Sequence, residues 1–356
     1  MPELQSASAC PLVNLRAPSW VNPFLRAFAS SRGILLLLLL LLLTSCDRDT
    51  APQVVLYTSI DQPMAAVVVR AFEAKTGVRV VLVTDTEATK SIGLAERLRA
   101  ERDNVQADVW WGNEPFHTIR LADEGLFEPY PTPGANDVPD LFKDPQHRWT
   151  GNGIRARVLA GHEMLDMNAP MGLNDLLNPE LRGKVALARP VASTTGGHVG
   201  ALYVLWGEEK FDAFFRALHA NELKVLGGNS NVAQAVGDGT ITLGLTDNDD
   251  VANVRAEGGK LNLKLPDQQD GQIGTLAIPT TVALVRGARQ PALAKQLIDY
   301  LVSNDVEQQM LDAKYFGWRV RDTSGARWMK ISYIEVASVM PTAVRRAAAL
   351  LEGREP

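Results

Sequence analysis

The chain has 356 residues, of which 46% are hydrophobic and 22% charged. This is the composition of a globular protein of about two domains, and it excludes a disordered or collagen-like chain. The formal net charge of −5 argues against a nucleic-acid-binding protein, which normally carries a basic face. Two cysteines are too few for a disulfide scaffold or a four-thiolate zinc site.

The N-terminal segment contains nine consecutive leucines, residues 35–43, with Arg26 and Arg32 before them. This apolar run is too short to span a hydrocarbon core of about 30 Å, but it suits the apolar region of a signal peptide. A buried core helix is disfavoured, because uninterrupted leucine leaves no polar face. The sequence Leu-Thr-Ser-Cys that ends at Cys46 resembles the bacterial lipoprotein box. This resemblance implies a signal peptide over residues 1–45, lipidation of Cys46 and a lipidated tether over residues 46–53, which would anchor the protein to a membrane outside the cytoplasm.

From residue 54 onward, short apolar runs alternate with amphipathic segments. We expect strands at residues 54–57, 78–84 and 108–111, and helices at residues 64–76, 91–102 and 116–124. Strands that alternate with helices at this interval indicate βαβ units and a mainly parallel sheet.

The pattern changes at residues 129–149, which are rich in Pro, Asp and Asn and predict a loop. Further strands are expected at residues 153–159, 184–188, 240–245 and 274–285, and further helices at residues 198–206, 209–220, 232–237 and 291–304. These elements suffice for two α/β lobes with a cleft between them.

Catalytic motifs find no support in the sequence. The run from Gly151 to Ala156 matches a dinucleotide-binding pattern, but a loop precedes it and a strand-like segment follows it, which is the wrong context. His162-Glu163 lacks the second histidine of a zinc protease, and no phosphate loop or nucleophile elbow occurs. The sequence therefore predicts a binding protein, and a two-lobed transferase or hydrolase remains only as a weaker alternative without a nucleophile–base pair.

Polar residues gather where the expected strands end. Ligands of open α/β sheets bind outside the carboxyl ends of the strands, so these loops are the candidate site. The loops are residues 58–61, 85–87, 112–114, 192–198 and 246–250, and residues 229–230 also precede a helix. Each loop has an ordinary alternative reading as a helix N-cap.

Two of these loops are more specific than the others. In residues 192–198, two threonines followed by two glycines would let an anion approach the backbone at a helix start. In residues 246–250, the carboxylates of Asp247, Asp249 and Asp250 repel one another unless a cation lies near or all three face solvent. A hard metal ion or an amine-bearing ligand would satisfy them.

Over most of its length the chain resembles the periplasmic solute-binding proteins of ABC transporters, and specifically the ferric-ion-binding type. The matching segments, in the family's order, are residues 55–59, 71–78, 106–111, 121–126, 176–183, 229–236 and 294–303. The resemblance implies an α/β, two-lobed periplasmic-binding-protein (type II) fold with two crossing hinge strands. It places lobe 1 at residues 54–152 and 274–305, lobe 2 at residues 153–273, and a C-terminal helical segment at residues 306–356.

The resemblance also implies site residues. Thr195, Gly196, Gly197 and Asn229 fall where the family anchors an anion, and the neighbouring Thr58, Ser59 and Thr194 join this candidate set. The candidate metal or cation ligands are Asp61, Glu114, Asp249 and Asp250. The resemblance further implies that the protein delivers its cargo to an ABC permease in the cytoplasmic membrane. We expect it to be a monomer with no resident cofactor and no nucleic-acid partner.

One departure from the family leaves the cargo open. The iron-binding members have two adjacent tyrosines where this chain has Asp249 and Asp250, and the sequence suggests no nearby tyrosine to compensate, since Tyr203 belongs to the preceding helix region. The first expectation is ferric iron held by oxygen ligands with a synergistic anion. The alternative is an organic anion or zwitterion such as a phosphonate, resembling aminoethylphosphonate, with no metal.

Overall fold

The computed structural model describes residues 51–85, 92–169, 171–191 and 193–356. Residues 51–356 form one compact unit. The leucine block, Cys46 and residues 86–87 of the second candidate loop lie outside the described residues. Within the described ranges, no helix is both long and apolar enough to cross a membrane.

The first lobe is built on a sheet with the strand order β2-β1-β3-β10. Strands β1, β2 and β3 are parallel, β10 is antiparallel to β3, and the short β4 extends the sheet beside β10. These strands are β1 (Gln53–Thr58), β2 (Arg79–Thr84), β3 (Val109–Gly112), β4 (Phe127–Glu128) and β10 (Ala277–Val285). The βαβ units predicted for the first half of the chain are confirmed.

The second lobe is built around β8, which lies between β5 and β6. Strand β6 is parallel to both β7 and β8, whereas β5 is antiparallel to β8 and β9. These strands are β5 (Thr150–His162), β6 (Val185–Ala188), β7 (Lys224–Leu226), β8 (Leu243–Asp247) and β9 (Leu261–Lys264). The sequence pattern did not reveal β7 and β9, which are only three and four residues long.

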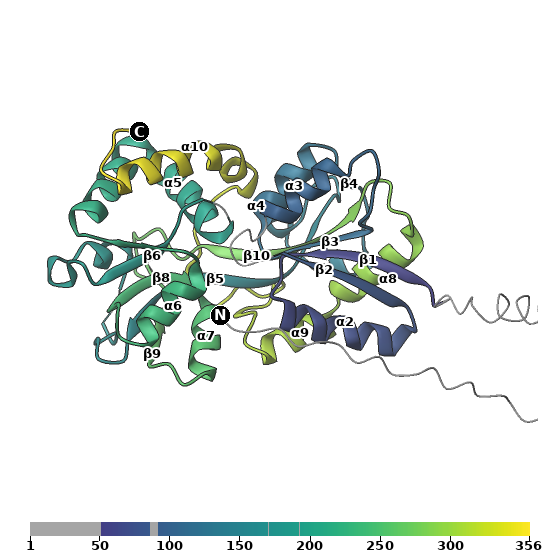
Figure 1. Ribbon diagram of the computed structural model, residues 1–356, viewed down its shortest axis with the longest axis horizontal. Coiled ribbons are helices and arrows are strands. Elements are labelled where there is room, and N and C mark those ends of the chain that lie inside the picture. Colours follow the sequence, from purple (N-terminus) through teal and green to yellow (C-terminus); the bar gives the residue numbers. More distant parts are fainter. Residues whose placement is uncertain (1–50, 86–91, 170, 192) are drawn as a thin grey trace, which may run out of the picture. The chain divides into compact units, whose positions relative to one another are not determined.

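Strand β5 connects the two lobes. Its first half pairs with β10 up to Ala156, and its second half pairs with β8 from Arg157 onward and with β9 (Figure 1). Every residue of β5 except the last is buried. The two-lobed α/β architecture predicted from the sequence is confirmed, and β5 and β10 are the strands that cross between the lobes. The residue boundaries predicted for each lobe stay a prediction, since β5 itself belongs to both sheets.

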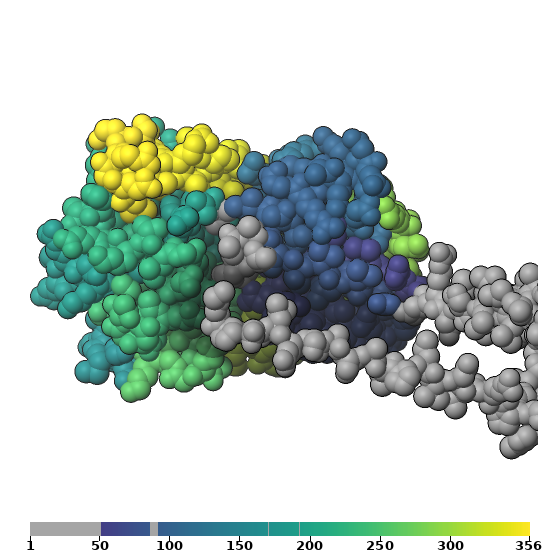
Figure 2. Space-filling model, in the orientation of Figure 1, coloured from purple at the N-terminus to yellow at the C-terminus, as the bar shows by residue number. Residues whose placement is uncertain are grey.

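Helices cover the sheets of both lobes. Helices α2 and α8 pack on the first sheet, α6 and α7 on the second, and α10 packs on α5 and α4 (Figure 1). In Figure 2 the yellow C-terminal surface lies directly on the teal surface of the second lobe. The helices are α2 (Gln62–Thr76), α3 (Ile92–Ala100), α4 (Pro115–Asp123), α5 (Ser193–Ala220), α6 (Asn229–Gly237), α7 (Asn248–Ala256), α8 (Pro291–Leu301), α9 (Asn304–Asp312) and α10 (Tyr333–Leu351).

Helix α5 begins earlier than the sequence suggests. Two helices were expected, at residues 198–206 and 209–220, and the structure has one run that starts at Ser193 and breaks at Gly207 (φ 70°, ψ 173°). A positive φ is readily adopted only by glycine, so the break lies where the sequence allows it. The early start matters for the site, because it places Thr194 and Thr195 in the first turn of a helix.

Candidate ligand-binding cleft

Polar residues of both lobes line one cavity of about 60 Å³. Its lining comes from the loop after β3, from β5, from the end of β8 and from the starts of α5, α6 and α7. The polar residues that line it include Asn113, Arg155, Arg189, Thr195, Asn229, Asp247 and Asp250.

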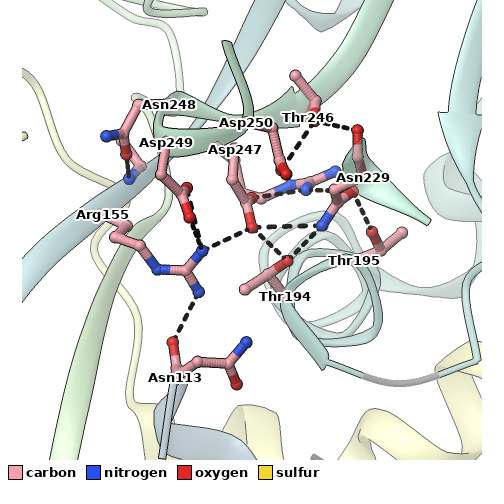
Figure 3. Close-up of polar contacts among 12 residues, drawn as sticks. Asn113, Arg155, Thr194, Thr195, Asn229, Thr246, Asp247, Asn248, Asp249 and Asp250 are labelled. Carbon is pink, nitrogen blue, oxygen red and sulfur yellow. Dashed lines mark hydrogen bonds and ion pairs between the residues drawn. The ribbon is translucent and has the colours of Figure 1, made fainter. Parts of the chain in front are cut away.

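Asp247 lies at the centre of a hydrogen-bond network. It ends β8 opposite Arg157 of β5, and its Oδ1 accepts a 2.7 Å hydrogen bond from Arg157 Nη1. Its Oδ2 accepts from Thr194 Oγ1 at 2.7 Å and from Arg155 Nη1 at 3.2 Å (Figure 3). Burial opposes ionisation of Asp247, but the charges of Arg157 and Arg155 outweigh it and lower the pKa of this carboxyl. Asp247 is therefore a buried carboxylate that the protein itself neutralises.

Arg155 binds a second aspartate of the cluster. Its Nη1 lies 2.9 Å from Asp249 Oδ2 and 3.1 Å from Asp249 Oδ1, and its Nη2 donates to the Asn113 carbonyl at 2.7 Å (Figure 3). Burial would lower the pKa of the guanidinium, but the nearby Asp249, Tyr315 and Asp247 raise it well above its usual value. Arg155 therefore carries its charge although it is 1% exposed.

The sequence predicted that Asp247, Asp249 and Asp250 either have a cationic neighbour or all face solvent, and the structure buries all three. In the structure their carboxylate oxygens lie within 4.8 Å of one another, and Arg155 and Arg157 supply two positive charges. Sequence reasoning missed both arginines. The available signal was their spacing, since residues two apart in a strand share one face and charged residues are rarely fully buried unless they are paired.

The predicted anion-binding residues meet at the starts of α5 and α6. Thr195 Oγ1 donates to Asn229 Oδ1 at 3.0 Å, and Asn229 Nδ2 donates to Thr194 Oγ1 at 2.7 Å (Figure 3). Arg189 is exposed at this edge of the cavity, and no side-chain ion pair or hydrogen bond holds it within the part of the chain that the structure describes. The two helix starts and this guanidinium make one end of the cavity favourable for an anion.

The two glycines of the candidate anion loop have packing roles. A Cβ on Gly197 would collide with the ring of Phe116 of α4, and one on Gly196 would contact Val344 and Met340 of α10. Gly197 thus allows α5 to pack closely on α4, whereas a Cβ at Gly196 would make only ordinary van der Waals contacts.

In lobe 1, the candidate residues are bonded mainly to their own lobe. Thr58 Oγ1 donates to the Trp111 carbonyl at 2.8 Å, and Ser59 Oγ lies 3.1 Å from Asn113 Oδ1 and accepts from Asn113 N at 2.9 Å. Asp61 precedes α2, and its charge helps to raise the pKa of Arg155. Ser59 and Asp61 thus belong to the loops that meet at the cleft, while the Thr58 hydroxyl is committed to the sheet.

Glu114 is directed into its own helix. Its carboxylate accepts hydrogen bonds from the backbone of Phe116 at 2.6 Å and of His117 at 3.3 Å, and it lies 2.9 Å from His117 Nδ1. This is the N-cap arrangement that the sequence analysis gave as the ordinary alternative.

A tyrosine does lie beside the aspartate cluster, contrary to the expectation from sequence. The Arg155 guanidinium carbon is 5.4 Å from the centre of the Tyr315 ring, and Tyr315 is buried after α9. The sequence hid this neighbour because Tyr315 follows a helix of lobe 1 and is far from Asp249 along the chain.

His198 lies one turn into α5, behind Asp247. It is fully buried, and neither ring nitrogen has a hydrogen-bond partner among the described residues. Burial, and then the charge of Arg157, lowers the pKa of its imidazole to about 3. His198 is therefore neutral at physiological pH.

The fold and the cleft define a class of two-lobed binding proteins, and comparison with known families agrees. Residues 52–314 match the model of the bacterial extracellular solute-binding protein family. The match covers well over half of the chain, so the protein belongs to this family.

Two relatives with names that state a cargo differ in that cargo. A Salmonella typhi periplasmic protein named for 2-aminoethylphosphonate binding is 26% identical over 229 residues, which are 62% of this chain and 65% of that protein. The iron uptake protein A1 of Synechocystis sp. is 25% identical over 256 residues, 68% of this chain and 69% of that protein. The chain thus spans just under two thirds of the length of the phosphonate-named relative.

Solved structures confirm the fold. Iron-bound HitA from Pseudomonas aeruginosa superposes with a TM-score of 0.73 at 22% identity, covering 83% of this chain and 99% of that one. AfuA from Actinobacillus pleuropneumoniae, with fructose-6-phosphate bound, gives 0.71 at 21% identity, covering 83% and 96%. The chain therefore has the type II periplasmic-binding-protein fold, which holds a metal in one neighbour and an organic phosphate in another.

Proposed function

We propose that this protein is the extracytoplasmic ligand-binding subunit of an ABC importer, anchored through lipidated Cys46, and that its cargo is a small organic phosphonate-like anion or zwitterion. Membership of the solute-binding family supports the importer role. The cargo class is inferred from the charges in the cleft, and 2-aminoethylphosphonate, for which a relative is named, is the model compound.

One observation carries the choice of cargo. Asp247 and Asp249 supply two of the three clustered carboxylates that could hold a metal ion, and both are already paired with Arg155, at 3.2 and 2.9 Å. A metal ion in contact with these oxygens would lie beside a buried guanidinium, and like charges in a poorly solvated site repel strongly. The pairing therefore favours a cargo that does not need these two carboxylates as ligands.

The cavity offers groups for both an anion and an amine. The starts of α5 and α6 lie together with Thr195 and Arg189, and the N–H groups of the helix starts and the guanidinium can donate to phosphonate oxygens. The Thr195 hydroxyl, which donates to Asn229 Oδ1, would have to turn toward the ligand. The Asp250 carboxylate lines the same cavity and would attract an ammonium group.

The size of the cavity sets a further limit. Since one water needs about 10–15 Å³ of such space, a cavity of about 60 Å³ holds only a few non-hydrogen groups. A compound as small as a short aminoalkylphosphonate suits this volume better than a sugar phosphate, which would require the lobes to move apart.

Calorimetric titration of the purified protein tests the cargo class. We expect saturable, one-to-one binding of 2-aminoethylphosphonate and weaker binding of ethylphosphonate, which lacks the amine, and of inorganic phosphate. Absence of heat with all three compounds, for protein shown to be free of copurified ligand, would contradict the proposed cargo.

Ferric iron is the second candidate, and the cluster of three carboxylates within 4.8 Å beside Tyr315 favours it. Under this alternative, Arg155 would have to move away from Asp249 as the metal enters. Iron retained through gel filtration by the purified protein, and lost in an Asp249→Ala/Asp250→Ala double variant, would support this candidate over the phosphonate.

A further inference from the structure

The Arg155 side chain reaches both walls of the cleft. It extends from β5, the strand shared by both sheets, where it pairs with Ile278 of β10. From there Nη1 reaches Asp247 and Asp249 of lobe 2, and Nη2 reaches the Asn113 carbonyl of lobe 1 (Figure 3). The same guanidinium lies over the ring of Tyr315, which packs in the apolar core of lobe 1.

These contacts have the geometry of a shared cation. Oxygen atoms from two lobes converge on one positive charge, as they would around a bound metal ion. A guanidinium can do this because its planar fork directs several donors at once, which a point charge cannot.

We infer that Arg155 takes the place of a cation between the two lobes, so that it neutralises the aspartate cluster and holds the lobes together without a metal. The inference rests on the proposed function, because a cargo without metal leaves this position to the guanidinium. It also goes further, since it makes Arg155 a positioning residue that influences how readily the empty cleft opens.

Two substitutions separate the charge of Arg155 from its bridging contacts. Arg155→Gln removes the charge and leaves Asp247, Asp249 and Asp250 with fewer positive neighbours. Arg155→Lys keeps the charge, but a single ammonium cannot bond to Asp249 and the Asn113 carbonyl in the same geometry. Arg189→Gln is the matched control, because it removes one positive charge from the same cavity without touching the aspartates.

The first measurement is small-angle X-ray scattering of each protein without ligand. We expect a larger radius of gyration for Arg155→Gln and for Arg155→Lys than for the wild type, and an unchanged value for Arg189→Gln. Wild-type scattering from Arg155→Lys, which has the better prospect of folding because it keeps the buried charge, would overturn the bridging role.

The second measurement is native mass spectrometry with manganese(II) chloride, because Mn²⁺ accepts carboxylate oxygen ligands. We expect one Mn²⁺ per chain in Arg155→Gln, and no stoichiometric Mn²⁺ in the wild type, Arg155→Lys or Arg189→Gln. Stoichiometric Mn²⁺ in the wild type, or none in a folded Arg155→Gln protein, would overturn the inference that Arg155 replaces a cation.

These readouts are separate from the cargo test. Scattering and Mn²⁺ binding use the protein without any phosphonate, whereas the calorimetric titration uses the wild type alone. A phosphonate that fails to bind, together with an Arg155→Gln protein that opens and takes up Mn²⁺, would refute the cargo and leave the role of Arg155 intact.

Discussion

The two walls of the cleft use their polar residues differently. On the lobe 2 wall, the buried Asp247, Arg157 and Thr194 and the half-buried Asn229 form one continuous network. On the lobe 1 wall, Ser59 bonds to Asn113, and Glu114 caps its own helix. Lobe 1 thus presents already satisfied groups and a backbone carbonyl, while lobe 2 holds most of the charge. Carboxylates in equivalent strand-end loops can therefore have unrelated roles, because the local hydrogen-bond and ion-pair partners of each carboxylate determine what else it can bind.

The largest expected effect is on the free energy of unfolding, when one carboxylate is neutralised on each wall of the cleft. Asp247→Asn leaves Arg155 and Arg157 short of a buried counter-charge, which costs about 3–5 kcal/mol of the free energy of unfolding. Glu114→Gln weakens a helix cap, which costs about 1 kcal/mol. Urea denaturation measures both, with the exposed Asp103→Asn as the control. Equal losses for Asp247→Asn and Glu114→Gln would break the distinction between the walls.

The next effect concerns the buried histidines, His198 behind the lobe 2 wall and His117 beside Glu114 in lobe 1. The pKa of His198 is lowered to about 3 in the folded protein, so below pH 6.5 the unfolded chain binds a proton there and the folded chain does not. The contribution of His198 to the free energy of unfolding therefore falls as pH drops below 6.5, by about 1.4 kcal/mol per pH unit.

Unfolding free energies measured between pH 6.5 and pH 4.5 test this prediction. Asp247 has a lowered pKa, so its stabilising contribution is present above about pH 4 and is lost only at lower pH. Burial raises the pKa of Asp267 to about 6, so the folded chain gains a proton there within this window and Asp267 opposes the effect of His198. We therefore compare each variant with the wild type, and we expect His198→Gln to lose less unfolding free energy than the wild type as pH falls and His117→Gln to follow the wild type. A wild-type pH dependence in His198→Gln would show that another group is responsible.

A smaller effect is expected for ligand affinity. Thr195→Val removes a hydroxyl that faces the cavity, and a hydrogen bond to a charged ligand contributes about 1.5–3 kcal/mol, so 2-aminoethylphosphonate should bind at least about tenfold more weakly. Ser59→Ala in lobe 1 should change the affinity much less, because the cavity is lined by Thr195 and not by Ser59. Calorimetry measures the affinities, with the exposed Thr240→Val as the control. A larger loss of affinity in Ser59→Ala than in Thr195→Val would show that the lobe 1 wall, and not the lobe 2 wall, contributes more to ligand binding.

The smallest effect is expected at the cavity mouth. Arg189 is exposed, and interactions of exposed charges contribute about 0.2–1 kcal/mol and are screened by salt. Arg189→Gln should therefore weaken phosphonate binding only a few-fold at low salt, with less difference as the salt concentration rises. A loss that does not depend on salt would mean that Arg189 contacts the ligand in a desolvated position.

The sequence predicted most of the strands and helices from local patterns, but not the short strands β4, β7 and β9. The rule that ligands bind at strand ends directed attention to five loops, of which three contribute residues to the cavity. The sequence could not predict how the charges pair. Arg155 and Asp247 are 92 residues apart, and their contact depends on the register of β5 against β8. Likewise, the role of Gly197 depends on Phe116 of a different helix, and Tyr315 approaches Arg155 only when the chain is folded.

The central claim is that the cleft takes a small anionic or zwitterionic cargo while Arg155 occupies the position of a metal. Native mass spectrometry of the purified protein with equal amounts of 2-aminoethylphosphonate and ferric citrate tests it directly. We predict one phosphonate per chain and no iron. One iron per chain, unaffected by the phosphonate, would contradict the claim.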